Sequence, residues 1–266
     1  MNVLFSTSMT SLKGMLGVWQ RNFIVYRQNW KISFIAPILE PLFYLLAFGY
    51  GLSSLVGNIR TSGIEVSYAT FIAPALIAIN IMNNAFFENT YSSFVRMYYQ
   101  KTFDAMMATP LTVHQIITGE ILWGATKSVI ATMVMMAVIS AFGLIQYPAG
   151  LVLIPLAFIG GMAFGSVGMY FTGIIKHIDL FNLPFFLFIT PMFLFSGTFF
   201  PVENLPQWAQ VIAGILPLTH LVNLSRSLCY GGIVDGKMFW QLGYILAFWM
   251  VFFALALHKM RQRLIR

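Results

Sequence analysis

F-S-G-T-F-F-P-V-E-N-L-P-Q-W at residues 195–208 and P-L-T-H-L-V-N-L-S-R at residues 217–226 are the two stretches that say most about the fold of this chain. Residues 209–222 are apolar, but they are fewer than the roughly 20 residues that a membrane-crossing helix needs. Pro217 also interrupts this run, because proline removes a backbone donor. We therefore predict that residues 209–222 dip into or lie on a membrane without crossing it.

The composition excludes an ordinary soluble domain. The 266 residues are 59% hydrophobic and only 9% charged, whereas soluble domains carry roughly a quarter charged residues. One cysteine excludes an internal disulfide, and the four histidines are scattered, so we expect no metal site and no cofactor. The net charge of +7 comes from Lys and Arg beside apolar runs, which favours membrane orientation over nucleic-acid binding. An all-α polytopic membrane protein is predicted.

Six apolar runs are long enough to cross a bilayer as helices. They comprise residues 32–56, 68–87, 116–142, 151–175, 180–200 and 239–257. Pro184 and Pro191 fall within the fifth run and predict a kink there. No early apolar core with a small-residue cleavage site is visible, so we expect the first span itself to direct insertion.

Basic residues indicate the orientation of these spans. Lys and Arg precede the first span, follow the second and fourth spans, and close the chain. On the other side lie only Arg60, Arg226 and Lys237. By the positive-inside rule, both termini are predicted to be cytoplasmic.

Two segments outside the spans have a recognisable pattern. Residues 11–31 place apolar and aromatic side chains at three- and four-residue steps, which is typical of a helix lying in the inner interface. A frayed tail is the alternative. The polar segment between the second and third spans ends at Thr109-Pro110 and is the one sizeable cytoplasmic loop expected. It is therefore the natural place for a cytosolic partner to bind.

These motifs resemble the membrane-spanning subunits of type 2 ABC exporters. The C-terminal signature comprises Leu194 to Thr198, Phe200-Pro201, Leu205-Pro206, Pro217 to His220, and Arg226. A second block, from Phe87 to Lys127, includes F-E-N-T-Y-S-S-F-V-R-M and G-E-I-L-W-G-A-T-K and is similar to the nodulation-factor (lipo-oligosaccharide) exporter branch. The two blocks and the six spans cover nearly the whole chain.

The resemblance implies a role for each segment outside the spans. Residues 11–31 would form an interface helix, residues 94–111 a cytoplasmic coupling helix that docks on an ATPase, and residues 198–222 external re-entrant helices. The chain itself is not expected to be an enzyme, because Gly124 of a possible phosphate-binding loop is followed by Ala125 rather than Lys. ATP hydrolysis is therefore assigned to a separate chain.

The expected function is that of a permease subunit in the bacterial inner membrane. It would act as a homodimer with two copies of a nucleotide-binding ATPase, among membrane lipids and without nucleic acid. The cargo would be a lipid-linked glycan, a lipo-oligosaccharide or an amphipathic drug-like molecule. An ATP-independent secondary transporter or channel of the same membrane fold is the alternative.

Charged residues inside predicted spans are the first candidate site residues, since a charge at mid-bilayer costs about 2.5–3.5 kcal/mol on insertion scales. Glu40 lies within the first span, either on the translocation path or as a buried packing residue. Glu88 ends the second span, where we expect it to be solvated. Glu120 and Lys127 share a face of the third span but lie too far apart to pair directly. Each could pair with another span, and Glu40 and Glu88 are possible partners for Lys127.

The predicted coupling helix and the re-entrant region hold the other candidates. Anchoring and charged side chains for an ATPase groove are Arg96, Tyr99, Lys101, Phe103, Asp104 and Met107. An ordinary solvated loop is the alternative for this segment. The external signature contributes Gly197, Pro201, Pro217, His220 and Arg226. For His220 and Arg226, bonding to carbonyls at broken helix ends is favoured over cargo contact.

Overall fold

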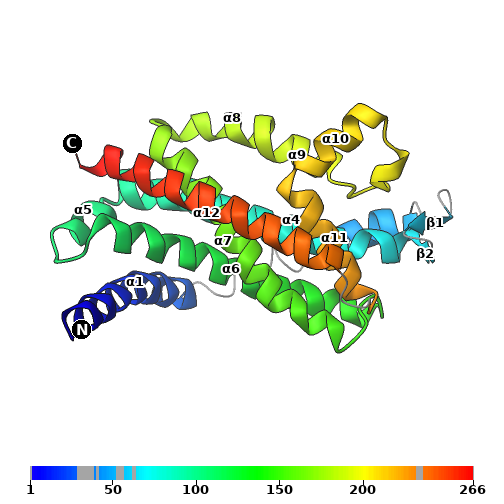
Figure 1. Cartoon of the computed structure of the whole chain (residues 1–266), viewed down its shortest axis with the longest axis horizontal. Helices are drawn as coiled ribbons and strands as arrows, with labels where there is room; N and C mark the ends of the chain where they lie inside the picture. Colours follow the sequence, from blue (N-terminus) through cyan, green and yellow to red (C-terminus); the bar gives the residue numbers. More distant parts are fainter. Residues whose placement is uncertain are drawn as a thin grey trace.

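A computed structural model describes residues 2–28, 39, 42–51, 57–61, 64–231 and 236–265 of the chain. Four long helices run along its longest axis (Figure 1). They are α4 (Tyr68–Phe87), α6 (Val113–Ala141), α7 (Leu153–Ile174) and α12 (Gly236–Leu264). Helix α7 packs against the other three, so it is the centre of the bundle.

Five helical segments of the described residues are long and apolar enough to cross a membrane. They are Tyr68–Tyr99, Val113–Ala141, Ala149–Ile174, Ile178–Phe195 and Gly236–Leu264. This confirms a helical, multi-span membrane protein. The predicted first span, residues 32–56, lies mostly outside the described residues, as does Glu40. Its described part includes Leu39 and the π-helical turn η1 (Leu45–Gly51).

The second span is longer than the sequence predicted. It begins at Tyr68, where the Ser67 side chain accepts a hydrogen bond from the Thr70 amide, but it does not end at residue 87. The helix continues through two π-helical turns, η2 (Glu88–Ser92) and η3 (Val95–Tyr99), for 32 residues in all. The charged residues that we expected to end the span therefore lie within it.

The expected coupling helix at residues 94–111 is not one helix. Its first part belongs to the long helix that ends at Tyr99. Lys101 then adopts a left-handed conformation with φ of 54°, and a separate short helix, α5 (Thr102–Met107), follows. Thr112 and Gln115 form a capping box that begins α6. The connection between the second and third spans is thus a sharp turn and a six-residue helix.

The fifth span is one 18-residue helical segment, Ile178–Phe195, in which a π-helical turn interrupts the α-helix, and the predicted kink stays a prediction. It consists of η5 (Ile178–Phe181), α8 (Asn182–Pro184), the π-helical turn η6 (Phe185–Ile189) and α9 (Thr190–Phe195). Pro184 and Pro191 lie on either side of the π-helical turn, where a missing backbone donor disturbs the regular bonding.

After α9 the chain makes a short 3₁₀ turn, η7 (Val202–Asn204), and two helices, α10 (Gln207–Ile215) and α11 (Pro217–Cys229). These two helices meet at an angle of 85° next to Pro217. A bent pair of this kind is either a broken span or a re-entrant loop, so the re-entrant assignment of residues 198–222 stays a prediction. Helix α11 extends beyond the predicted segment to Cys229.

Three further elements complete the described chain. Helix α1 (Asn2–Gln28) covers most of the predicted interface helix, and residues 29–31 lie outside the described residues. Strands β1 (Asn58–Thr61) and β2 (Ile64–Ser67) form an antiparallel hairpin that the sequence analysis did not predict. The 3₁₀ turn η4 (Ala149–Val152) leads into α7.

Two glycines of α7 allow its neighbours to approach closely. A Cβ atom on Gly161 would lie 2.8 Å from the Ala125 Cα atom of α6, and one on Gly168 would lie 2.8 Å from the Phe86 carbonyl oxygen of α4. Real Cβ atoms do not tolerate such contacts with backbone. Small residues along this helix therefore permit the tight packing that membrane helices use.

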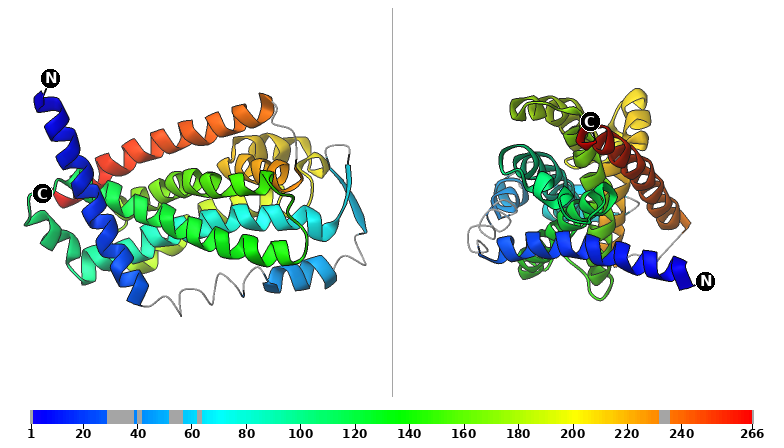
Figure 2. Two further views of the ribbon diagram at one scale, coloured as in Figure 1. Left: turned by 90° about the horizontal axis from the view of Figure 1, so that it is seen from below. Right: turned by 90° about the vertical axis from the view of Figure 1, so that its left-hand side faces the viewer.

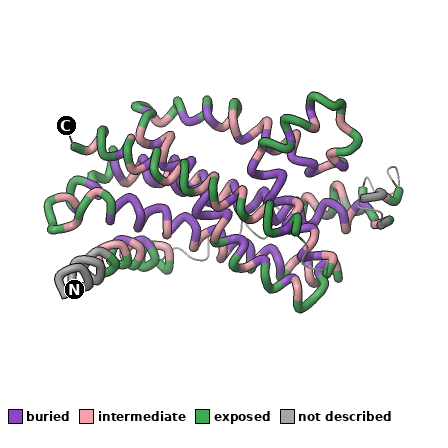
Figure 3. Tube along the Cα trace, viewed as in Figure 1, coloured by how far each residue is buried: buried purple, intermediate pink, exposed green. Residues whose placement is uncertain are grey.

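The two ends of the bundle differ in what they hold. Helix α5, helix α1 and the C-terminal end of α12 lie at one end, and the β hairpin and α10 lie at the other (Figure 1). Figure 2 shows α1 crossing the long helices at an angle. Buried residues gather along α4, α6 and α7 (Figure 3), whereas only 22% of the fifth span's apolar window and 11% of that of α12 are buried. The last two spans therefore keep wide faces for lipid or another chain.

Candidate functional site: a buried charge network

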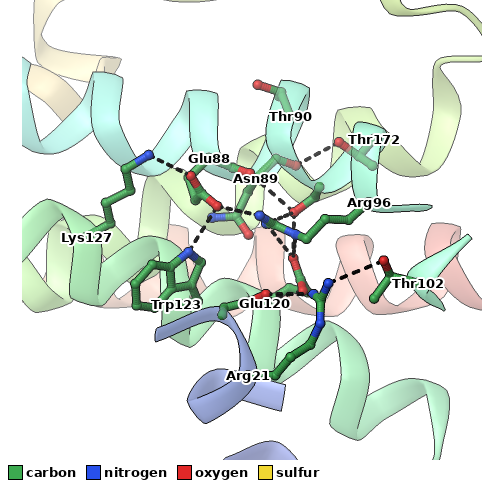
Figure 4. Close-up of polar contacts among 12 residues, drawn as sticks. Arg21, Glu88, Asn89, Thr90, Arg96, Thr102, Glu120, Trp123, Lys127 and Thr172 are labelled. Atoms are coloured by element: carbon green, nitrogen blue, oxygen red, sulfur yellow. Dashed lines mark hydrogen bonds and ion pairs between the residues drawn. The ribbon is translucent and has the colours of Figure 1, made fainter. Parts of the chain in front are cut away.

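Four charged side chains meet inside the bundle near the α5 end (Figure 4). Glu88 comes from η2, Arg96 from η3, and Glu120 and Lys127 from α6. The π-helical turns occur where this network forms. Such turns are rare in proteins, and those that occur are often at functional sites. The continuation of the second span past residue 87 is thus what brings Glu88 and Arg96 to face α6.

Arg96 is the centre of the network. Its Nη1 atom donates to Glu88 Oε1 at 2.8 Å, and its Nε and Nη2 atoms donate to Glu120 Oε2 at 2.9 and 2.6 Å. The Arg96 side chain is 13% exposed. A planar guanidinium bridging two carboxylates is a strong, geometrically specific arrangement. Arg96 was predicted to contact an ATPase, but these bonds hold it inside the protein.

Glu88 is buried rather than solvated, which corrects the sequence-based prediction. Its side chain is 4% exposed. Besides Arg96, it accepts hydrogen bonds from Trp123 Nε1 at 3.0 Å and from Lys127 Nζ at 2.8 Å. Lys127 is therefore paired with one of the two partners that the sequence suggested. Three donors compensate the carboxylate for its removal from water.

Glu120 is fully buried and links the network to α1. Its Oε1 atom accepts a hydrogen bond from Asn22 Nδ2 at 2.8 Å, and its Oε2 atom accepts one from Ser93 Oγ at 2.9 Å in addition to those from Arg96. Two carboxylates thus face Arg96 and Lys127, so the network is neutral. It joins α1, the second span and the third span at one place.

Helix α1 packs closely on α6 beside the network. A Cβ atom on Gly119 would lie 2.6 Å from the Val18 Cβ atom, so only glycine permits this approach. Trp19 Nε1 donates to Thr126 Oγ1 at 2.9 Å, and the Tyr26 ring meets the Trp123 ring edge-on at 5.4 Å. Burial raises the pKa of Tyr26, which keeps its hydroxyl protonated.

Sequence reasoning missed the contributions of α1 and of neutral side chains. Asn22, Ser93 and Trp123 each hold a carboxylate of the network. Ser93 and Trp123 lie within the two quoted motifs, but nothing there marks them as partners of a carboxylate, and Asn22 lies 98 residues from Glu120 in the sequence. The close approach of α1 to α6 at Gly119 brings Asn22 to Glu120, and only the folded chain reveals this approach.

The predicted coupling residues divide into two groups. Phe103 is fully buried in the same apolar cluster as Phe94 and Met97, and Arg96 belongs to the network, so neither is an exposed anchor as predicted. The remaining four are Tyr99, Lys101, Asp104 and Met107. Met107 is half-buried, and the other three are exposed. The exposed side of α5 is therefore formed by a smaller set than the sequence suggested.

Of the residues of the external signature, Gly197 and Arg226 are in contact, near the opposite end of the bundle. Arg226 is 8% exposed and donates from Nη2 to the carbonyl oxygens of Gly197 and Thr198. His220 Nε2 lies 3.0 Å from the Gly214 carbonyl oxygen, at the end of α10. Both contacts fit the structural interpretation, in which side chains bond carbonyls at broken helix ends. Pro201 is buried between η7 and the turn, and Pro217 begins α11.

The contacts found at these two sites are ion pairs, hydrogen bonds and ring contacts. Within residues 2–28, 39, 42–51, 57–61, 64–231 and 236–265, no group of three or more His, Cys, Asp or Glu side chains could hold a metal ion. The charge network links α1, the second span and α6 through strong, directional bonds.

Residues 15–230 match the family model described as ABC-2 type transporter. This chain belongs to the ABC-2 type transporter family. The match covers α1 from Met15 onward, the charge network and the residues around Arg226. All the described site residues of this ABC-2 family member thus lie within the matched region.

Relatives agree with this ABC-2 assignment over nearly the full length. The chain is 36% identical to Nodulation protein J of Rhizobium leguminosarum bv. trifolii, covering 97% of this chain and 98% of the relative. It is 32% identical to Nodulation protein J of Rhizobium meliloti (strain 1021), covering 94% and 93%. It is 22% identical to Inner membrane transport permease YadH of Escherichia coli (strain K12), covering 89% and 90%.

Proposed function

We propose that this chain is the membrane-spanning subunit of an ATP-driven exporter and that ATP is hydrolysed by a separate ABC-type ATPase chain. The carrying observation is the ABC-2 family match together with relatives named Nodulation protein J along almost the whole chain. In this proposal two copies of the chain work with two ATPase subunits in the inner membrane, with both termini cytoplasmic.

The proposed cargo is a lipo-oligosaccharide or a related lipid-linked or amphipathic molecule. The resemblance of residues 87–127 to the nodulation-factor exporter branch supports this class. The wide unburied faces on the fifth span and on α12 leave room for a second copy of the chain beside them. The translocation path would then run between the two copies.

Helix α5 is the proposed lever between the ATPase and the spans. It is short, begins after the left-handed turn at Lys101, and carries exposed Asp104. Its buried Phe103 packs into the cluster that also holds Phe94 of the second span and Ile116 of the third. A push on α5 would therefore move both spans, and the charge network would keep α1 with them. ATP binding would shift the population between two such arrangements.

The test is co-purification and coupled ATPase activity of the full complex. Asp104→Lys reverses a charge on the exposed side of α5, and we expect it to reduce cargo-stimulated ATP hydrolysis and export by about tenfold while membrane levels stay normal. Glu203→Lys makes the same reversal on an exposed residue at the opposite end and should leave both activities unchanged.

Two outcomes would contradict the proposal. Recovery of the tagged chain without any ATP-binding protein in several mild detergents would favour an ATP-independent transporter. Normal coupling in Asp104→Lys would refute the lever assignment. Phe103→Asp is unsuitable for this test, because it places a charge in a fully buried apolar site and would report on folding.

A further inference from the structure

A cavity of about 410 Å³ opens beside the charge network. Helix α1 forms one wall, the η2 and η3 turns form a second, and α6 forms the third. Its charged lining consists of Arg21, Glu88, Arg96 and Lys127, and its aromatic lining consists of Tyr26, Tyr91 and Trp123. The cavity therefore combines cationic groups with flat apolar surfaces at the level where α1 meets the spans.

The charge balance of this cavity is positive. Arg96 and Lys127 are matched by Glu88 and Glu120 in the neutral network described above. Arg21 is the additional cation. No ion pair of Arg21 within 4.0 Å is found in the part of the chain that the structure describes. A negatively charged ligand would complete the balance.

Arg21 is placed to bind such a ligand. Its Nη1 atom donates to Asn22 Oδ1 at 2.9 Å, and its Nη2 atom has only a long contact of 3.4 Å to Thr102 Oγ1. Both acceptors are neutral, and a guanidinium has five N–H donors in a fork that matches phosphate oxygens. Partial burial of Arg21 strengthens its bonds to an anion, because water screens them less. The same burial lowers its pKa from the usual value, yet the group stays charged at neutral pH.

The rim of the cavity suits a lipid better than a free ion. Val25 lines the cavity and is 49% exposed, and its neighbour Ile24 is 50% exposed. The same helix exposes Leu12, Leu16 and Phe23 on a separate face, on the opposite side of α1 from Val25. An amphipathic helix with such a face lies at the boundary between head groups and acyl chains. A phosphate held by Arg21 would then be attached to chains that cover this apolar rim.

We propose that this cavity binds the phosphate of an anionic lipid head group, with Arg21 as its principal ligand and Val25 at the mouth beside the first acyl carbons. The site is independent of the proposed export activity, because it requires only that the chain lies in a membrane. It would anchor α1, and through Asn22 the charge network, to the composition of the surrounding leaflet.

The experiment is a lipid titration of the purified full chain in detergent, read by native mass spectrometry. Phosphatidylglycerol should bind about tenfold more tightly than phosphatidylcholine, the ratio expected for one strong charged contact. Arg21→Gln should remove this preference, and Arg21→Lys should retain part of it. The matched control is Arg27→Gln, which removes an exposed charge from the same helix outside the cavity and should keep the preference within about twofold.

A second pair of variants protects the test against misfolding of the Arg21 variants. Val25→Glu places a negative charge at the cavity mouth, whereas Ile24→Glu places it on an equally exposed neighbour outside the lining. Phosphatidylglycerol binding should fall in the first variant and persist in the second.

Three results would overturn the proposal. They are equal binding of the two lipids by the unaltered chain, an equal loss in Val25→Glu and Ile24→Glu, and displacement of phosphatidylglycerol by millimolar inorganic phosphate. The last result would reassign the cavity to a free anion.

Discussion

Arg96 and Arg226 are both buried arginines, but opposite ends of the molecule stabilise them differently. Arg96 lies between two carboxylates, Glu88 and Glu120. Arg226 has no carboxylate within 4.0 Å among the described residues. Its guanidinium bonds the carbonyl oxygens of Gly197 and Thr198 and lies 3.9 Å from the centre of the Phe71 ring.

The difference separates two ways to bury a cation. In the Arg96 network each charge is paired with an opposite charge. Removing one member therefore leaves its partner buried without a counter-charge in a region of low dielectric constant. The Arg226 site uses backbone dipoles and an aromatic ring, which remain neutral if the arginine is removed. The first depends on side-chain identity, and the second depends on the path of the turn through Gly197.

Removing Arg96 should have the largest effect. Arg96→Leu leaves Glu120 without a cationic partner and Glu88 with Lys127 alone, so we expect a loss of about 3–5 kcal/mol in stability. Thermal unfolding of the purified chain in detergent measures it. The Arg96→Leu/Glu120→Gln double variant should recover part of the loss, because the unpaired charge is gone. A loss no greater than that of Arg261→Leu, an exposed control, would contradict this account.

Removing Arg226 should cost less. Arg226→Met keeps the bulk of the side chain but leaves two carbonyls unsatisfied and loses the contact with Phe71, for an expected loss of about 1–3 kcal/mol. The same unfolding measurement applies. Arg226→Lys should be intermediate, because a single ammonium cannot reproduce the guanidinium fork. A loss as large as that of Arg96→Leu would show that Arg226 has a charged partner.

The turn that holds Arg226 should be the next most sensitive element. Gly197 has φ of +71°, and a Cβ atom there would lie 2.6 Å from Val202 Cγ2. Gly197→Ala should cost about 1–2 kcal/mol in backbone strain and additional crowding. Gly143→Ala is the matched control, since Gly143 has φ of +69° and nothing within 4 Å of its added Cβ. Equal losses of stability in the two variants would show that crowding against Val202 does not contribute to the loss.

Replacing Lys127 should have the smallest effect on stability of the changes within the network. Its side chain is 31% exposed, and Glu88 keeps Arg96 and Trp123 when it is lost. Lys127→Gln should lower stability by about 1 kcal/mol or less, and added salt should reduce the difference. Lys101→Gln, which breaks a 3.8 Å pair between exposed side chains, should have no measurable effect. A large loss in Lys127→Gln would mean that Arg96 alone cannot hold Glu88.

The two ends also differ in how far they could be predicted. Pro217 and the short apolar run before it predicted a break, and the structure has an 85° bend there. Glu88 was placed at a solvated helix end because a charge normally terminates an apolar run. It lies inside a longer helix instead, since Arg96 on the same helix and Lys127 on the next one neutralise it. Predicting spans from apolar runs treats each charge separately, so it does not take such pairing of charges into account.

The β hairpin and the split of residues 94–111 show the same limit. Four-residue strands are too short to give a clear alternating pattern. At Lys101, a left-handed conformation separates two helical segments, and nothing in the local sequence marks a lysine for that role.

The sequence by itself determined that this chain is a helical membrane protein, because run length and charge distribution depend on local composition alone, and its motifs carried the resemblance to the ABC-2 type. It also determined where Pro217 separates α10 from α11. Only the tertiary structure decided which charges meet. Glu120 finds Asn22 of α1, and Glu88 finds Lys127, because close packing at Gly119 and Gly161 sets helix separations and rotations that no single segment encodes.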